Sequence, residues 1–143
     1  MKAILIALTA LTLSLNADEK AADPFGAKKA PDSKFPGEYV GTYISDGEKI
    51  KYGLQIFALG EGKFRAIGFN GGLPGAGFKK GGKIERVEGK LAKGKKGSER
   101  IVFQNDDEEA IADLRKGRIV AREAGEVIAR LKKVTREKPI IGE

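Results

Sequence analysis

The sequence predicts an all-β domain: an antiparallel meander of about eight short strands that forms a small barrel or a sandwich. Two observations carry this prediction. Apolar and polar residues alternate in twos over short runs, which is the period of a strand with one buried face. Glycine-containing turns separate the runs at regular spacing, and the chain has 20 glycines among its 143 residues.

The first three strands are the clearest. Residues 38–44 alternate, with Tyr39, Gly41 and Tyr43 on one face, and a turn of small and acidic residues follows. Residues 50–59 carry bulk on both faces, which indicates a central strand. After a short glycine turn, a third strand follows at residues 64–69. Short loops between consecutive strands are typical of a meander.

The remaining strands are predicted from a more charged pattern. A basic loop separates the fourth strand from the fifth, and the pairs Lys116-Gly117 and Ala124-Gly125 separate the last three. A helical alternative remains for the C-terminal third, because it is rich in good helix formers. The two glycines favour strands, since the pieces between them are short for stable helices. The five expected strands lie at residues 87–91, 101–103, 110–114, 119–121 and 127–134.

The N-terminus has the layout of a secretory signal peptide: a lysine, an uncharged apolar run, then small or polar residues. We expect an N-terminal helix that is cleaved after Ala17, with cleavage near Ala21 or Ala22 as the alternative. We expect the product to be exported, periplasmic or extracellular, and to have no transmembrane segment after cleavage. The expected organisation is a signal peptide (1–17), a flexible leader (18–36), a β domain (37–135) and a C-terminal tail or linker (136–143).

The amino-acid composition limits the reactions and metal sites that this chain can support. The chain has no cysteine and no histidine, which excludes thiolate metal sites, thiol nucleophiles and a histidine base. We therefore expect no metal and no cofactor. The formal net charge of +7 favours anionic partners such as polysaccharide or acidic lipid headgroups. An export signal argues against nucleic acid. A lysine-rich surface that simply keeps a strand-rich protein soluble is the alternative.

Two further segments do not match a phosphate-binding or metal-binding motif. The glycine-rich loop Asn70–Gly77 lacks the lysine and the hydroxyl residue that end a phosphate-binding loop. The acidic run Asn105–Glu109 lacks the ligand spacing and the central glycine of an EF-hand, and we interpret it as a solvated turn. The glycine loop could still border a binding groove.

Aromatic and apolar residues supply the candidate ligand contacts. Tyr39 and Tyr43 share a strand face and could form a small platform for a sugar ring. Tyrosines that close the edge of a core are the alternative. Leu73 and Phe78 flank the glycine-rich loop. The predicted ligand-binding residues are Tyr39, Tyr43, Leu73 and Phe78.

A resemblance to a known family lies in three segments of the chain: KYGLQIFALGEGKFRAIGFNGGLPGAGF, GEYVGTY and ARLKKVTREKPIIGE. This chain resembles the N-terminal β domain of exported planctomycete-type proteins, where that domain precedes a 3-keto-disaccharide hydrolase domain. The resemblance covers residues 37–143 and implies a neighbourhood in carbohydrate metabolism. It carries no active site, since the hydrolase domain has no counterpart in this sequence.

We therefore expect a non-catalytic, exported accessory or interaction module that binds a glycan or a carbohydrate-active enzyme. Two alternatives stay open. The first is a glycoside-acting hydrolase that uses carboxylates such as Glu48, Glu61 or Asp106. The second is a structural module that docks a separate hydrolase.

Overall fold

The computed structural model describes residues 23–142, and the predicted signal peptide lies outside them. The described chain is all-β, as predicted, with one 3-10 turn, η1 (Ala27–Lys29). Its strands are β1 (Gly37–Ser45), β2 (Glu48–Gly60), β3 (Lys63–Asn70), β4 (Leu73–Pro74), β5 (Gly77–Phe78), β6 (Ile84–Ala92), β7 (Glu99–Asn105), β8 (Glu108–Arg115), β9 (Arg118–Glu123) and β10 (Glu126–Val134).

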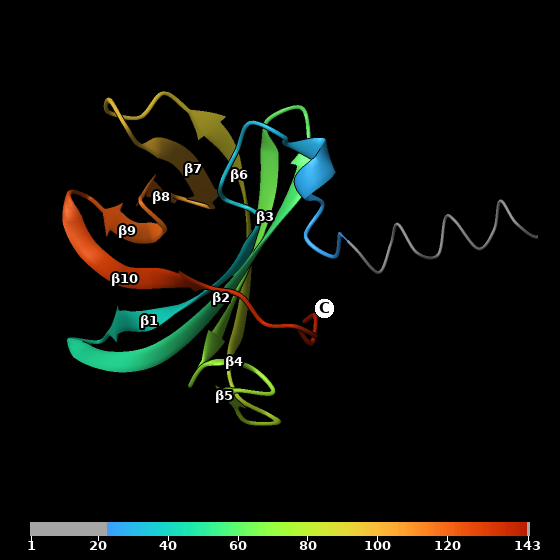
Figure 1. Cartoon of the computed structure of the whole chain (residues 1–143). Helices are drawn as coiled ribbons and strands as arrows, with labels where there is room; N and C mark the ends of the chain where they lie inside the picture. Colours follow the sequence, from blue (N-terminus) through green and yellow to red (C-terminus); the bar gives the residue numbers. More distant parts are fainter. Residues whose placement is uncertain (1–22, 143) are drawn as a thin grey trace, which may run out of the picture.

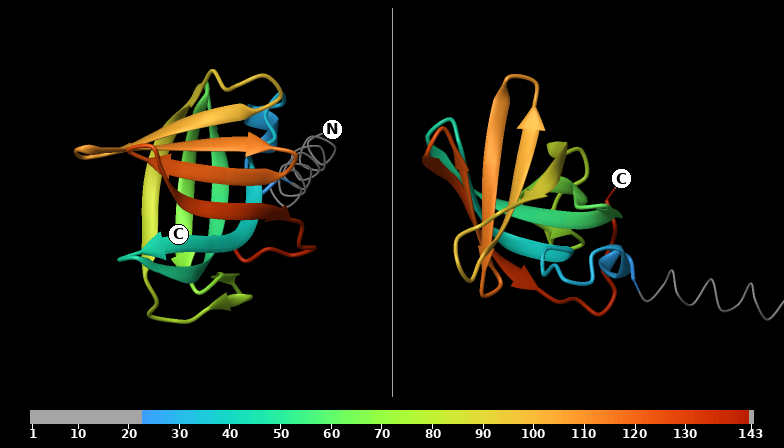
Figure 2. Two further views of the ribbon diagram at one scale, coloured as in Figure 1. Left: turned by 90° about the vertical axis from the view of Figure 1, so that its left-hand side faces the viewer. Right: turned by 90° about the horizontal axis from the view of Figure 1, so that it is seen from above.

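Eight of these strands form one closed antiparallel barrel (Figure 1). The order around the barrel is β1-β10-β9-β8-β7-β6-β3-β2, and β1 completes the ring by pairing with both β2 and β10. Figure 2 shows β7 to β9 crossing β2, β3 and β6 at a steep angle. The sequence did not distinguish a barrel from a sandwich. The pairing of β1 with β10 closes the sheet, so the fold is a barrel.

The C-terminal third consists of strands, as the sequence favoured, because tight turns interrupt it. Lys116 and Gly117 both have positive φ between the paired residues Arg115 and Arg118. Ala124 and Gly125 make the same two-residue turn between β9 and β10. Positive φ at both central positions gives a type I′ hairpin, whose twist matches that of the flanking strands.

The N-terminal segment closes one end of the barrel. Phe35 is fully buried in the main core, and the Tyr39 hydroxyl donates a hydrogen bond of 2.8 Å to its carbonyl oxygen. The Phe25 ring packs 5.3 Å from the Phe57 ring on β2. Glu99 accepts bonds from the Ser33 hydroxyl and the Lys34 amide. Residues 23–36, expected as part of a flexible leader, thus contact the barrel, because their aromatic rings bury apolar surface there.

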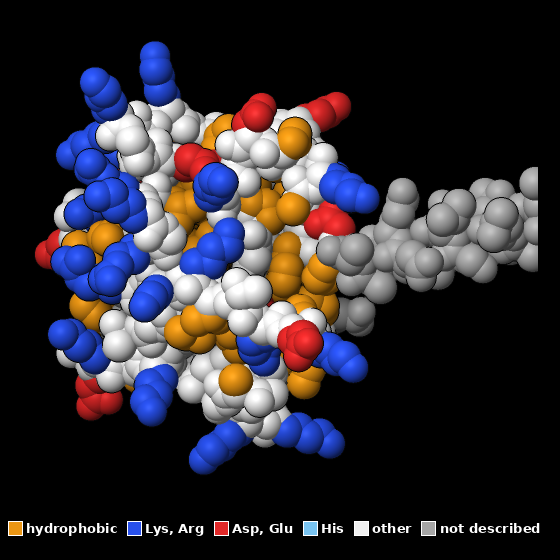
Figure 3. Space-filling view, viewed as in Figure 1, with side chains coloured by type: hydrophobic (Ala, Val, Ile, Leu, Met, Phe, Trp, Pro, Cys, Tyr) orange, Lys and Arg blue, Asp and Glu red, His pale blue; other side chains and the backbone are white. Residues whose placement is uncertain are grey.

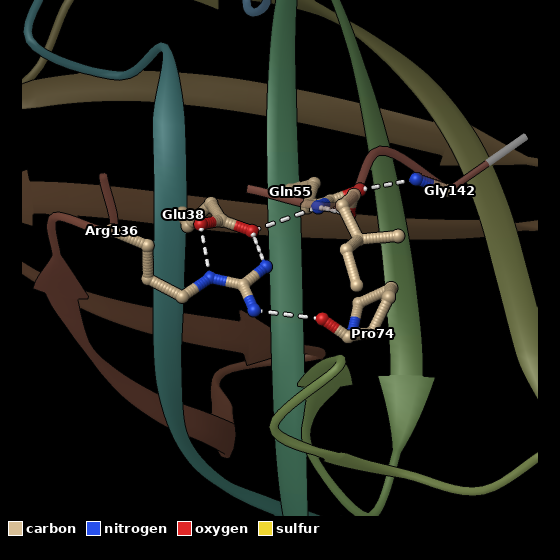
Figure 4. Close-up of polar contacts among 6 residues, drawn as sticks. Glu38, Gln55, Pro74, Arg136 and Gly142 are labelled. Atoms are coloured by element: carbon tan, nitrogen blue, oxygen red, sulfur yellow. Dashed lines mark hydrogen bonds and ion pairs between the residues drawn. The ribbon is translucent and has the colours of Figure 1, made fainter. Parts of the chain in front are cut away.

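The C-terminal segment covers the outer face of β1 and β2 (Figure 4). Glu38 is only 2% exposed, and the Arg136 guanidinium donates to both of its carboxylate oxygens. The same guanidinium donates to the carbonyl oxygen of Pro74, in the connection between β3 and β6. Gln55, fully buried, donates to Glu38 and to the Ile140 carbonyl, and accepts from the Gly142 amide. The expected tail is therefore bonded to the barrel through residue 142.

Residues 23–142 contain no helix that is both long enough and apolar enough to cross a membrane.

Candidate functional site

The inside of the barrel holds a cavity of about 170 Å³. Its wall is mostly apolar, and five alanines from the four strands β3, β8, β9 and β10 contribute to it. An alanine side chain stops at Cβ, so a ring of alanines leaves unfilled volume where larger residues would meet across the barrel. The cavity-lining alanines are Ala66, Ala110, Ala112, Ala121 and Ala129.

The cavity lies toward one end of the barrel because side-chain size differs along the axis. The other end, closed by Phe35, is filled by large buried side chains that include Tyr39 and Phe64. Toward the open end the inward positions carry alanine, and the aromatic residues stand at the rim. We call this open rim the mouth; it is formed by Tyr43, Tyr52, Glu85, Asn105, Glu108 and Glu123.

Two tyrosines form the aromatic side of the mouth. The rings of Tyr43 and Tyr52 stack with their centroids 4.8 Å apart and their planes 22° apart. Tyr52 can lie over β3 because position 68 is glycine: a Cβ there would stand 1.8 Å from the Tyr52 hydroxyl oxygen. Burial, and then the negative charge of Glu85, raises the pKa of both tyrosines. Both hydroxyls are therefore protonated and able to donate hydrogen bonds near neutral pH.

Three carboxylates form the acidic side of the mouth. Burial, a hydrogen bond to Glu108 and the charges of Glu108 and Glu85 raise the pKa of Glu123. Glu85 has a cationic neighbour in Lys83, at 3.1 Å between Nζ and Oε1. Within residues 23–142, neither Glu108 nor Glu123 forms a salt bridge. Negative charge thus accumulates at the entrance of an apolar cavity, with only Glu85 paired.

The structure separates the four residues that the sequence proposed as ligand contacts. Tyr43 lines the cavity and the mouth. Tyr39 is fully buried at the closed end and cannot form an exposed platform with Tyr43. Leu73 is 1% exposed and lies over Gly53, outside the barrel wall. Phe78 packs against Phe69 with ring centroids 5.2 Å apart, also on the outer face.

Sequence reasoning did not identify Tyr52, Glu85, Glu108 and Glu123 as site residues. A signal for the cavity was present: Ala110 and Ala112, and then Ala121 and Ala129, occupy inward positions where large apolar residues are usual in a core. Glu108 and Glu123 come from neighbouring strands of one hairpin, β8 and β9, whereas Glu85 comes from β6 and joins them only in the folded barrel.

A larger hollow, of about 820 Å³, lies on the outer face of β7 to β9. Its centre is occupied by a salt-bridge cluster within the protein. Arg100 contacts both carboxylate oxygens of Asp113, at 2.7 and 3.1 Å, and Arg122 lies 3.7 Å from the same carboxylate. Because the Asp113 carboxylate is already engaged by two arginines and the hollow lies on the outer face of the sheet, we regard the interior cavity as the better ligand site.

Of the three carboxylates considered for a hydrolase, one lies at the opposite end of the barrel from the other two. Glu48 begins β2 and Asp106 lies in the turn between β7 and β8, both at the open end. Glu61 lies in the turn between β2 and β3, at the closed end. Glu61 therefore cannot act with either of the others on one bond.

Within residues 23–142, no group of three or more acidic side chains is arranged to hold a metal ion. The chain matches no protein-family model, no curated protein and no solved structure, so its kinship to the planctomycete-type β domain stays a prediction.

Proposed function

We propose that this chain is a binding module that holds a small molecule inside its barrel, with an apolar body in the cavity and a cationic end at the mouth. The observation that carries the proposal is the interior cavity, whose alanine-rich wall opens beside unpaired carboxylates. Pockets that combine an apolar wall with a few polar groups at one side are typical of small-molecule sites.

The size of the cavity limits the apolar part of the ligand. An apolar cavity of about 150 Å³ is known to accommodate benzene. At about 170 Å³, this cavity suits one ring or a short branched alkyl group. Longer molecules would have to extend through the mouth, past Tyr43 and Tyr52.

The charges at the mouth favour an amine. Burial raises the pKa of Glu123, and so does Glu108, which is close enough to share a hydrogen bond with it, because two neighbouring carboxylates repel when both are ionised. A protonated amine placed between them replaces the shared proton and donates to both. A carboxylate ligand would add a further negative charge there.

A neutral sugar is the second candidate, in line with the expectation of an exported accessory module near carbohydrate metabolism. The stacked Tyr43–Tyr52 pair and the polar side chains of Asn105 and Glu108 at the mouth favour it. Aromatic faces and hydrogen-bonding side chains together suit a sugar ring. In that case the ligand stays at the mouth and its binding does not depend on ligand charge.

Three one-ring probes of similar size test the proposal by titration calorimetry: benzylamine, benzyl alcohol and benzoate. We expect benzylamine to bind best and benzoate worst. Glu108→Gln/Glu123→Gln should weaken benzylamine binding about tenfold or more, since hydrogen bonds to charged groups contribute about 1.5–3 kcal/mol. Glu126→Gln is the matched control, because Glu126 pairs with Glu123 in the same hairpin but does not line the cavity.

A second variant pair tests the cavity itself. Ala121→Leu fills the cavity and should abolish binding of all three probes, whereas Ala92→Leu, outside the cavity wall, should leave binding unchanged. Binding that survives Ala121→Leu would contradict the interior site. Equal binding of benzylamine and benzyl alcohol would contradict the cationic end, and binding of methyl glucoside by both glutamine variants would support the sugar instead.

A further inference from the structure

Cationic side chains form a row at the closed end of the barrel, opposite the mouth. Arg115 pairs with Arg118 across β8 and β9, and Arg118 pairs with Lys132 across β9 and β10. All three side chains are exposed. Neighbouring strands are about 4.8 Å apart, so three positive groups stand in a row of about 10 Å. Figure 3 shows lysines and arginines gathered over the part of the molecule where Figure 1 draws β7 to β10.

Two turns extend this row into a broader surface. Lys116 stands at the tip of the hairpin that carries Arg115 and Arg118. The connection between β6 and β7 lies beside them, since a Cβ added to its Gly97 would be 3.9 Å from the Arg115 guanidinium. We call this surface the basic end; it consists of Lys95, Lys96, Arg115, Lys116, Arg118 and Lys132.

The fold does not neutralise the charges of the basic end. Among residues 23–142, none of its six side chains forms a salt bridge. Like charges placed directly opposite one another across a sheet destabilise it. Lys95, Arg115 and Arg118 also line the outer hollow, whose other two arginines, Arg100 and Arg122, instead share Asp113. Positive charge that is not neutralised within the protein, and that stands on protruding turns, is available to bind an anionic partner.

We propose that the basic end docks on a lipid surface with anionic headgroups. Its cations stand on a hairpin tip and on an exposed connection, positions that can reach a flat surface together. The basic end offers no aromatic ring on which bases or sugars could stack, because the one aromatic residue between 79 and 142, Phe103, is buried in the core. Docking here leaves the mouth, at the opposite strand ends, open to solvent.

Sedimentation with lipid vesicles tests this docking. The full chain is mixed with vesicles of phosphatidylcholine alone or of phosphatidylcholine with phosphatidylglycerol; the neutral vesicles measure any binding supplied by residues 1–22. Arg115→Gln/Arg118→Gln/Lys132→Gln should lower partition onto the anionic vesicles about 100-fold, since each basic residue near such a surface contributes about fivefold. Added salt should weaken the wild-type binding in the same way.

The matched control removes the same number of charges elsewhere. Lys49→Gln/Lys79→Gln/Lys80→Gln leaves the basic end intact and has the same net charge as the first variant, and all three residues are exposed. It should keep wild-type partition. Equal losses in the two triple variants, or equal binding to neutral and anionic vesicles, would overturn the proposal.

A soluble polyanion separates lipid from other anionic partners. Dextran sulfate that binds the wild-type chain while anionic vesicles do not would assign the basic end to a polymer and overturn the lipid surface. Glu123→Gln, at the mouth, should leave vesicle binding unchanged, so this test is independent of the proposed ligand.

Discussion

Glu123 lines the interior cavity and is also one of the three carboxylates of the mouth. Its carboxyl stands at the end of β9, within hydrogen-bonding reach of Glu108 and near Glu85. Burial and these neighbours disfavour its ionised form, so its pKa in the folded chain lies above the ordinary value. Because an unfolded chain has no such neighbours, ionised Glu123 destabilises the fold.

The sign of this linkage gives a prediction for stability against pH. For an acid whose pKa is raised by folding, stability increases as pH falls from above the folded pKa to below the ordinary value. Glu123→Gln should therefore unfold at a higher temperature than wild type near pH 8. The difference should disappear near pH 3, where the glutamate is protonated in both states. Thermal unfolding followed by circular dichroism measures it, and equal unfolding temperatures of the two proteins near pH 8 would contradict the linkage.

At the scale of elements, hairpin turns decide the structure of the C-terminal third. Its segments contain good helix formers, yet Lys116-Gly117 and Ala124-Gly125 both adopt positive φ and reverse the chain after two residues. The sequence indicated Gly117 and Gly125 as turn residues. It did not show that Lys116 and Ala124 would also take left-handed backbone, since non-glycine residues do so mainly when both flanking strands are paired.

Ala124 is a position at which a substitution can stabilise the turn between β9 and β10. Its φ is 50°, a conformation that costs alanine about 1 kcal/mol or more and that asparagine tolerates better. Ala124→Asn should therefore stabilise the protein by up to about 1 kcal/mol. Urea unfolding measures the change. Ala76→Asn, at an exposed position without positive φ, should change stability little, and an equal gain there would contradict the turn argument.

For the whole molecule, both ends of the described chain complete the barrel. The N-terminal segment closes one end, and the C-terminal segment covers the outer face of β1 and β2 through Arg136 and Gly142. These contacts join residues that are 98 and 87 positions apart. Glu38, at 2% exposure, depends on Arg136 for its charge partner.

Arg136→Met should thus be strongly destabilising. It leaves the Glu38 carboxylate buried without its cation, which typically costs about 3 kcal/mol. Glu38→Gln/Arg136→Met should recover much of the loss, because no unpaired charge remains. Urea unfolding of the single and double variants measures both effects. If Arg136→Met unfolds like wild type, the C-terminal segment does not stabilise the barrel as described.

The sequence by itself determined the class of the fold, because strand alternation and turn chemistry are local and the residues that produce them are neighbours in the chain. It also indicated most strand positions, and it singled out Tyr43, although as part of a platform with Tyr39 and not as a residue of a barrel mouth. Tertiary structure alone decided that the sheet closes, that Tyr39 is buried, and that Glu85 joins Glu108 and Glu123 at one rim. Closure depends on pairing β1 with β10, a contact between segments about 90 residues apart, which no local pattern specifies.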